Sequence, residues 1–213
     1  MRRLSAPLAA IAVAVAAAAP AFGHGGNPHY RSSVRAVVPA VPGLAVRVLN
    51  YDDRLEMSNR TGRAIEIPGY DHEPYLRITG GGRVEVNRRS PSYYVNSERY
   101  GLAAPPPQAD SKAPPQWQTV SNTGRYEWHD HRIHYMSKAT PPRVTDEGKR
   151  TKVFDWKVPM TVDGRRGAIR GDLYWQPASS SSAPTGAIVA FAIFVLVTGA
   201  FMAIVTLRRR RRS

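Results

Sequence analysis

The feature that most constrains this chain is a stretch near its C-terminus, Thr185–Leu207, that contains no charged residue. As a helix, these 23 residues would be about 34 Å long at roughly 1.5 Å per residue, which is enough to cross the hydrocarbon core of a bilayer. Arg208–Arg212 follow directly, and basic residues stay on the cytoplasmic side of a membrane. The sequence therefore predicts one transmembrane helix over residues 185–207 and a cytoplasmic arginine tail over residues 208–213.

The N-terminus carries a second membrane signal, which predicts export. Arg2 and Arg3 precede a short apolar run, and small residues follow that run where signal peptidase cleaves. We expect residues 1–23 to be a signal peptide, with cleavage after Ala21 or after Gly23. An uncleaved N-terminal anchor is the alternative, but the apolar run is short for a membrane span.

Residues 24–177 lie between these signals and form the predicted extracytoplasmic domain, which is long enough to bury a hydrophobic core. The Ser- and Pro-rich segment that follows, residues 178–184, has the composition of a flexible stalk. The predicted location is the cell membrane, with a single pass, the N-terminal domain outside the cytoplasm and the C-terminus inside.

The formal net charge of +14 is unevenly distributed along the chain. Seven of the 30 basic residues belong to the two membrane signals, so 23 basic and 16 acidic residues remain, a net charge of +7. A moderately basic outer domain favours contact with anionic lipid headgroups or acidic cell-wall polymers. We expect no nucleic acid partner, because an exported domain would meet lipids and wall polymers but not nucleic acid. The absence of cysteine excludes disulfides and cysteine-ligated metal sites.

Short runs of alternating apolar and polar residues in the outer domain predict half-buried β-strands. Five such runs, separated by turn-forming residues, are Leu44–Leu49, Leu55–Ser58, Ile65–Ile67, Leu76–Ile78 and Val84–Val86. Two longer runs, Val153–Val158 and Ala168–Trp175, are expected to pair around a turn at Asp163–Gly164.

No convincing amphipathic helix appears outside the two membrane segments, and the proline-rich segment 102–116 is expected to be a long loop. Many short strands spaced by turns are typical of antiparallel sandwiches. The predicted fold class is therefore all-β: an antiparallel Ig-like β-sandwich ectodomain with a single C-terminal transmembrane helix.

Histidines are concentrated in one segment of the outer domain. Three of the six lie in Trp128–Met136, with the sequence WHDHRIHYM. If this segment is a strand, His129 and His131 point to one face, and His134 points to the other together with Met136. Two imidazoles that emerge side by side can hold one metal ion.

Neutral imidazole suits zinc, copper and nickel, and the thioether of Met136 would favour cuprous copper. Asp130 or Asp71 could supply a further ligand or hold an imidazole in place. If signal-peptide cleavage exposes His24, its amine and ring could also chelate copper. The competing interpretation is that these histidines pack on the sheet and bind no metal.

Enzyme signatures are missing from the sequence. It contains no Gly-x-Ser-x-Gly elbow, no phosphate-cradling glycine loop and no His-Glu-x-x-His pattern. We therefore expect a protein that is not an enzyme.

Four fragments resemble uncharacterised, signal-bearing, single-span proteins of high-GC actinobacteria: GYDHEPYLRI, NRRSPSYYVN, WHDHRIHYM and GDLYWQP. That family has no settled biochemical role, so the resemblance implies no catalytic residue. The chain is also weakly similar to exported copper-binding domains of the CopC type, which are small Ig-like sandwiches. This likeness rests on His24, on the pair His129 and His131, and on the late hairpin VPMTVDGRRGAIRG, and it places copper ahead of zinc.

The leading hypothesis is a membrane-anchored, extracytoplasmic binding or assembly protein that binds copper through histidines. The alternative is a metal-free envelope interaction module that contacts a membrane protein partner or an anionic wall polymer.

Overall fold

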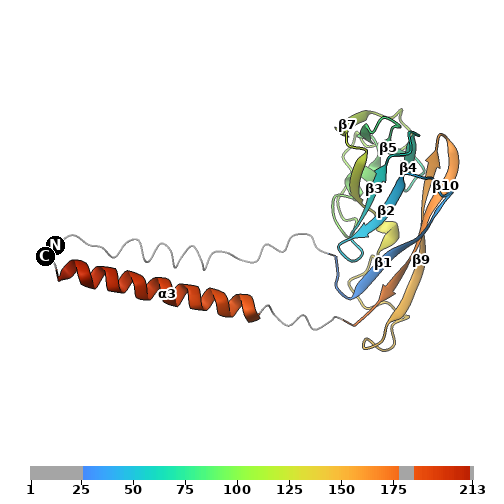
Figure 1. The fold of residues 1–213 in the computed structure, drawn as a ribbon. Coiled ribbons are helices and arrows are strands. Elements are labelled where there is room, and N and C mark those ends of the chain that lie inside the picture. Colours follow the sequence, from blue (N-terminus) through green and yellow to red (C-terminus); the bar gives the residue numbers. More distant parts are fainter. Residues whose placement is uncertain (1–25, 178–184, 212–213) are drawn as a thin grey trace. The chain divides into compact units, whose positions relative to one another are not determined.

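The computed structural model describes residues 26–177 and 185–211, which belong to two separate units. The first unit contains the outer domain and the second contains the C-terminal helix (Figure 1). The predicted signal peptide, His24 and the stalk over residues 178–184 lie outside the described residues.

Ten strands form the framework of the described part of the first unit (Figure 1). They are β1 (Tyr30–Val38), β2 (Leu44–Leu49), β3 (Arg54–Asn59), β4 (Ile65–Pro68), β5 (Pro74–Ile78), β6 (Val84–Asn87), β7 (Trp117–Ser121), β8 (Arg125–His129), β9 (Thr151–Val162) and β10 (Arg165–Trp175). Two short helical segments interrupt them, namely α2 (Pro91–Val95) and the 3₁₀ turn η1 (His131–Ile133).

The strands form two antiparallel sheets that pack face to face. The larger sheet has the order β1-β10-β9-β4-β5-β6-β7, and the smaller one has the order β2-β3-β8. The core contains residues of both sheets, including Leu55 and Met57 of β3, Trp128 of β8 and Ile169 of β10. The prediction of an all-β antiparallel sandwich with a C-terminal apolar helix is confirmed.

The two long strands β9 and β10 form the predicted hairpin. Their register places Val162 opposite Arg165, so that only Asp163 and Gly164 turn the chain. Both turn residues have positive φ, 47° and 74°, which matches the right-handed twist of the flanking strands. The composition of the turn thus sets the register of the longest strand pair in the molecule.

The five-residue helix α2 was not predicted from the sequence. It begins at Pro91, whose fixed φ suits the first position of a helix. Five residues are too few to show helical periodicity, and this explains why the pattern gave no signal. Residues 102–116 contain neither helix nor strand.

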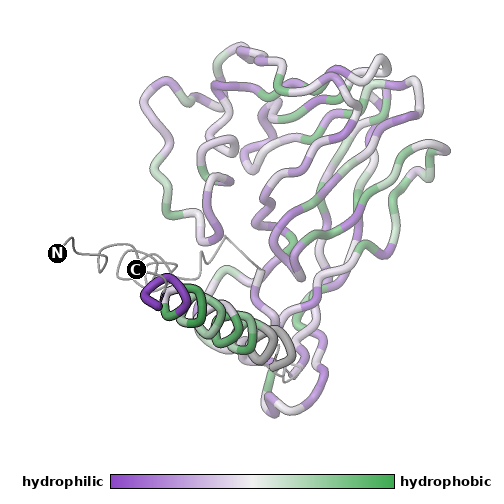
Figure 2. The backbone as a smooth tube through the Cα atoms, turned by 60° about the vertical axis from the view of Figure 1, so that its left-hand side comes forward, coloured by the Kyte–Doolittle hydropathy of each residue, from purple (hydrophilic) through white to green (hydrophobic). Residues whose placement is uncertain are grey.

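The second unit contains the helix α3 (Thr185–Arg210). Its segment Phe191–Arg210 has a mean hydropathy of 2.1 and is long and apolar enough to cross a membrane. Figure 2 shows the helix as largely hydrophobic with a hydrophilic C-terminal end, where Arg208–Arg210 lie. A single candidate membrane helix therefore lies at the C-terminal end of the described chain.

Gly171 provides a test of the packing between β10 and its neighbours. A Cβ atom at this position would lie 2.1 Å from the Ser33 carbonyl oxygen and 2.1 Å from the Trp156 ring. We predict that Gly171→Ala lowers the free energy of unfolding by about 1–3 kcal/mol, because neither the strand backbone nor the buried indole can move aside freely. Denaturation of the full-length protein in neutral detergent would measure the change.

Gly81 is the matched control, because a Cβ atom there meets no atom within 4 Å. Gly81→Ala should change the free energy of unfolding by no more than about 0.5 kcal/mol. Equal stability of the two variants would contradict the tight packing at Gly171.

Candidate metal centre

The histidine segment is not a continuous strand. Strand β8 ends at His129, and Asp130 then caps the 3₁₀ turn η1 by accepting a hydrogen bond from the backbone N–H of Arg132. The turn reverses the expected alternation of faces, so His134 joins His129 and His131 instead of pointing away from them. The prediction that His134 lies on the opposite face is wrong, because it assumed an extended backbone.

The three imidazoles form one group, here called the histidine cluster: His129, His131 and His134. Each offers a nitrogen that lies within 4.8 Å of the nitrogens offered by the other two. The ring centroids are 4.8–5.3 Å apart, and the rings meet edge to face. His134 is almost fully buried, with 1% of its surface exposed.

The shortest distance within the cluster joins Nε2 of His129 to Nε2 of His134, at 2.9 Å. Two nitrogens bound to one tetrahedral ion at about 2.0–2.1 Å would be about 3.3 Å apart. These two atoms are therefore already close to the separation that a shared metal ion requires. The nitrogen that His131 offers lies within 4.8 Å of both.

One nitrogen of each ring lies against an oxygen atom elsewhere in the protein. The pairs are His129 Nδ1 with Asp53 Oδ1 at 3.0 Å, His131 Nε2 with the Glu98 carbonyl oxygen at 2.9 Å, and His134 Nδ1 with the Tyr135 carbonyl oxygen at 3.3 Å. Carboxylate and carbonyl oxygens accept hydrogen bonds but cannot donate them, so these ring nitrogens carry the proton. Histidines that bind metal ions are usually oriented in this way.

The arrangement of His129 and His134 has an electrostatic consequence. With both Nδ1 atoms donating to oxygen, the two Nε2 atoms face one another with lone pairs in the neutral forms. Lone pairs at 2.9 Å repel one another unless a cation, either a proton or a metal ion, lies between them. In these tautomers the pair could hold a cation between its two Nε2 atoms.

The surroundings of the cluster keep two of its rings neutral. Burial, followed by the nearby positive charge of Arg99, lowers the pKa of His134 to about 3. Burial is also the main cause that lowers the pKa of His131. Because neutral imidazole is the form that binds metal ions, His134 would not need to lose a proton at neutral pH.

Asp130 shapes the site and is not one of its ligands. Its buried carboxylate accepts hydrogen bonds from Nε and Nη2 of Arg132, each at 2.7 Å, and from Nε1 of Trp128 at 2.9 Å. Burial alone would raise the pKa of Asp130, but the charge and hydrogen bonds of Arg132 hold it below its usual value. The other acidic candidate, Asp71, is exposed and is not part of the cluster.

Asp53 is a functional candidate that the sequence did not reveal. Positive φ angles at Asn50 and Tyr51 form the turn between β2 and β3 that places Asp53 against His129. Burial is the largest effect on the pKa of Asp53 and would raise it, but the hydrogen bond and charge of His129, together with the charges of Arg54 and Arg99, lower the pKa overall. Its only sequence signal was a pair of acidic residues directly before a strand.

Met136 lies at the outer side of the cluster, with 41% of its surface exposed. A Cβ atom built on Gly101 would lie 3.2 Å from Nδ1 of His131 and 3.5 Å from the Met136 methyl carbon. The thioether and the imidazole of His131 thus border the same glycine. His131 itself stacks on Tyr70, with ring centroids 5.7 Å apart and planes within 9°.

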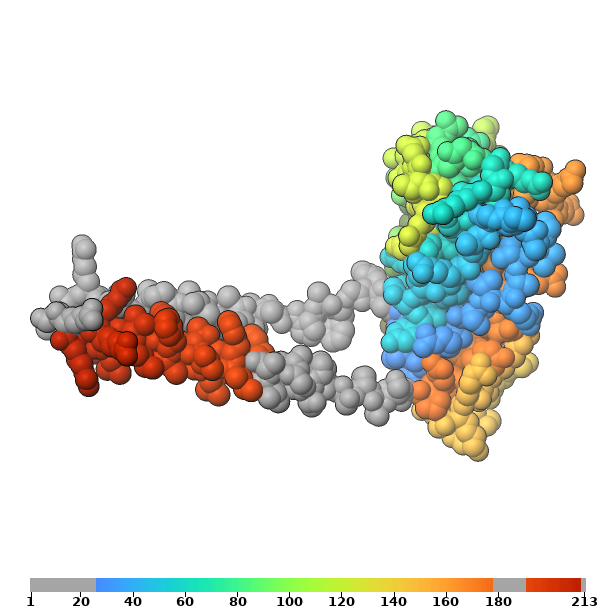
Figure 3. Space-filling view, viewed as in Figure 1, coloured from blue at the N-terminus to red at the C-terminus, as the bar shows by residue number. Residues whose placement is uncertain are grey.

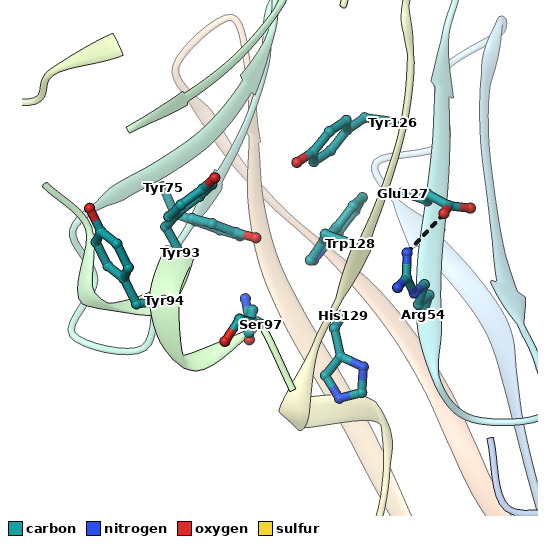
Figure 4. Close-up of a pocket in the computed structure, with 10 residues that line it drawn as sticks. Arg54, Tyr75, Tyr93, Tyr94, Ser97, Tyr126, Glu127, Trp128 and His129 are labelled. Carbon is teal, nitrogen blue, oxygen red and sulfur yellow. Dashed lines mark hydrogen bonds and ion pairs between the residues drawn. The ribbon is translucent and has the colours of Figure 1, made fainter. Parts of the chain in front are cut away.

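Two cavities reach His129 from the surface. One, of about 270 Å³, lies between β8 and α2 and is walled by tyrosines, with Tyr93 and Tyr94 on one side and Tyr126 on the other (Figure 4). The second, of about 190 Å³, is bordered by Asp53, Arg99 and His129. Of the three histidines of the cluster, His129 is the one that lines both cavities.

No family model, curated protein or solved structure matches the chain. The resemblances drawn from the four sequence fragments and from the late hairpin therefore remain predictions.

The pKa of His134 generates a pH prediction for the metal-free protein. Between pH 6.5, the ordinary value, and about 3, the unfolded chain binds a proton at this residue that the folded chain does not. The free energy of unfolding should therefore fall as the pH drops through this window, by up to about 1.4 kcal/mol per pH unit. Above pH 6.5 this residue should contribute no pH dependence.

Denaturation at pH 4.5 to 7 in the presence of a chelator would measure this effect. His134→Gln should flatten the dependence, whereas His72→Asn, in an exposed turn, should leave it unchanged. An identical slope in both variants would show that His134 is not held neutral by burial.

Proposed function

We propose that this protein is a single-span membrane protein whose outer β-sandwich binds one copper ion through His129, His131 and His134. The observation that carries the proposal is the pair of Nε2 atoms of His129 and His134, which face each other at 2.9 Å. Each of these rings has its other nitrogen held by an oxygen acceptor. The proposed role is binding or assembly in the cell envelope, and not catalysis.

The arrangement favours a bound metal over simple packing. Histidines that serve only as core residues would be expected to satisfy each nitrogen with a separate polar partner. Here two buried nitrogens are satisfied only by each other, and the pKa of His134 is far too low for a proton to reside there at neutral pH. A metal ion removes the repulsion between the lone pairs without protonating a buried ring.

The donor set supports copper. The cluster consists of imidazoles alone, without a carboxylate oxygen for magnesium or calcium, and cysteine is absent from the sequence. Among divalent first-row metals, copper binds such nitrogen ligands most tightly. Met136, next to His131 at Gly101, provides a soft thioether that suits the cuprous ion. Zinc is the competing metal, and a titration would distinguish the two.

The proposed topology follows from the two ends of the chain. The arginines that follow the apolar part of α3 favour a cytoplasmic C-terminus, and the N-terminal signal favours export of the sandwich. The histidine cluster would then meet metal ions outside the cytoplasm. The alternative, a metal-free module that contacts a membrane partner or an anionic wall polymer, predicts no specific metal binding.

Metal titration tests the proposal. Full-length protein in neutral detergent would be titrated with cuprous, cupric and zinc ions in competition with a chelator of known affinity. We predict that His129→Gln/His134→Gln weakens copper binding by at least about 100-fold, because the loss of two of three ligands removes the site. The control, His29→Gln/His72→Gln, removes two histidines outside the cluster and should bind copper like the wild type. Equal copper affinities in the two double variants would disprove the site.

Asp53→Asn tests the orientation of His129. The amide keeps the size of the carboxylate but removes the charge that holds the Nδ1 proton, so copper affinity should fall by about 10–100-fold. Glu127→Gln, which removes an exposed carboxylate paired with Arg54, is the control and should not change it. Normal copper binding by Asp53→Asn would show that this carboxylate does not support the site.

A further inference from the structure

The outer face of the large sheet carries two clusters of charge where β1, β10 and β9 lie side by side. In the first, Arg35 pairs with Asp155 at 2.9 Å and with Asp172 at 3.0 Å. Lys152 pairs with the same two carboxylates at 2.8 Å and 2.9 Å. Two cations and two anions thus balance within this cluster.

The second cluster lies closer to the hairpin turn and is not balanced. Lys157, Arg166 and Arg170 surround a hollow of about 230 Å³, here called the basic hollow, whose lining also includes Val38 and Ala168. The pairing register places Lys157 of β9 directly opposite Arg170 of β10. This end of the hairpin stands at the surface, where it is visible in orange in Figure 3.

No carboxylate in the described parts of the chain forms an ion pair with Lys157, Arg166 or Arg170. The nearest carboxylates on this face, Asp155 and Asp172, lie two residues along the same strands and are already paired with Arg35 and Lys152. Like charges directly opposite one another on a sheet are destabilising. Further from the hairpin turn, Asp155 and Asp172 balance the cations of the same two strands. The excess of positive charge is therefore confined to the end of these strands near the turn.

We infer that the basic hollow is a binding site for a phosphate group carried by a ligand outside the cell. Two guanidinium groups can each donate paired hydrogen bonds to phosphate oxygens, and the ammonium group of Lys157 adds a third positive charge. Three cations that line one hollow match the charge of a phosphate better than that of a single carboxylate. The site lies on the large sheet and uses none of the residues of the histidine cluster, so it is independent of the proposed copper site.

Calorimetric titration tests this inference. Full-length protein in nanodiscs of zwitterionic lipid would be titrated with inorganic phosphate and, separately, with glycerol phosphate. Vesicles that contain phosphatidylglycerol form a third arm, which distinguishes a lipid headgroup from a soluble or polymer-borne phosphate. The test variant combines Lys157→Gln, Arg166→Gln and Arg170→Gln. All three side chains are exposed, so the substitutions should leave the fold intact.

The matched control removes the same charge from three exposed residues elsewhere: Arg60→Gln, Lys112→Gln and Arg143→Gln. We expect the wild type and the control to bind at least one of the phosphate probes, and the test variant to bind it about tenfold or more weakly. Binding in the phosphate arms supports a soluble or polymeric ligand, and binding in the vesicle arm alone supports a lipid headgroup. Failure of the wild type to bind any probe, or equal loss of binding in both triple variants, would overturn the inference.

Discussion

Asp130 keeps its charge in the interior of the domain, and the geometry of the histidine cluster depends on it. Its two oxygens accept hydrogen bonds from the guanidinium and backbone of Arg132 and from the Trp128 indole. This network ends β8 and begins the 3₁₀ turn. Removing one partner of such a buried pair costs about 3–5 kcal/mol, because the other charge is left without compensation. These contacts therefore stabilise the turn that leads from His129 to His134.

The frame around the cluster extends well beyond this turn. Nη1 of Arg132 donates to the Pro68 carbonyl oxygen, and the Tyr70 hydroxyl accepts from the backbone N–H of His131. On the other side, the carboxylate of Glu98 accepts backbone hydrogen bonds from its own loop, which positions its carbonyl oxygen for His131. The three rings are thus held by segments that lie far apart in the sequence. A metal site at these histidines would need rigid support of this kind to be preorganised.

The sequence was sufficient to identify the histidines but not their arrangement. The density of histidines alone singled out His129, His131 and His134. Period-two alternation placed His134 on the wrong face, because Asp130 ends the strand and begins a 3₁₀ turn. That capping role depends on contacts of Asp130 with Trp128 and Arg132, which the sequence pattern does not show. Asp53 could not be assigned to the site, since it reaches His129 only through the pairing of β3 with β8. Alternation predicted seven of the ten strands of the described chain, whereas β1, β7 and β8 were not predicted from it. The division of the strands into sheets of seven and three depends on long-range pairing that a local pattern does not contain.

The lack of cysteine limits both how the domain can be stabilised and which ligands it can offer to a metal ion. A chain without thiols has neither disulfides to stabilise its domain nor thiolates to bind soft metal ions. The sandwich instead uses a large apolar core and buried ion pairs, such as Asp52 with Arg99 at 2.6 Å. Imidazole is then the strongest ligand for copper or zinc that the sequence offers, and thioether is the only sulfur donor. Because the histidine cluster lies beside the small sheet and the basic hollow lies on the outer face of the large one, changes at either should combine additively.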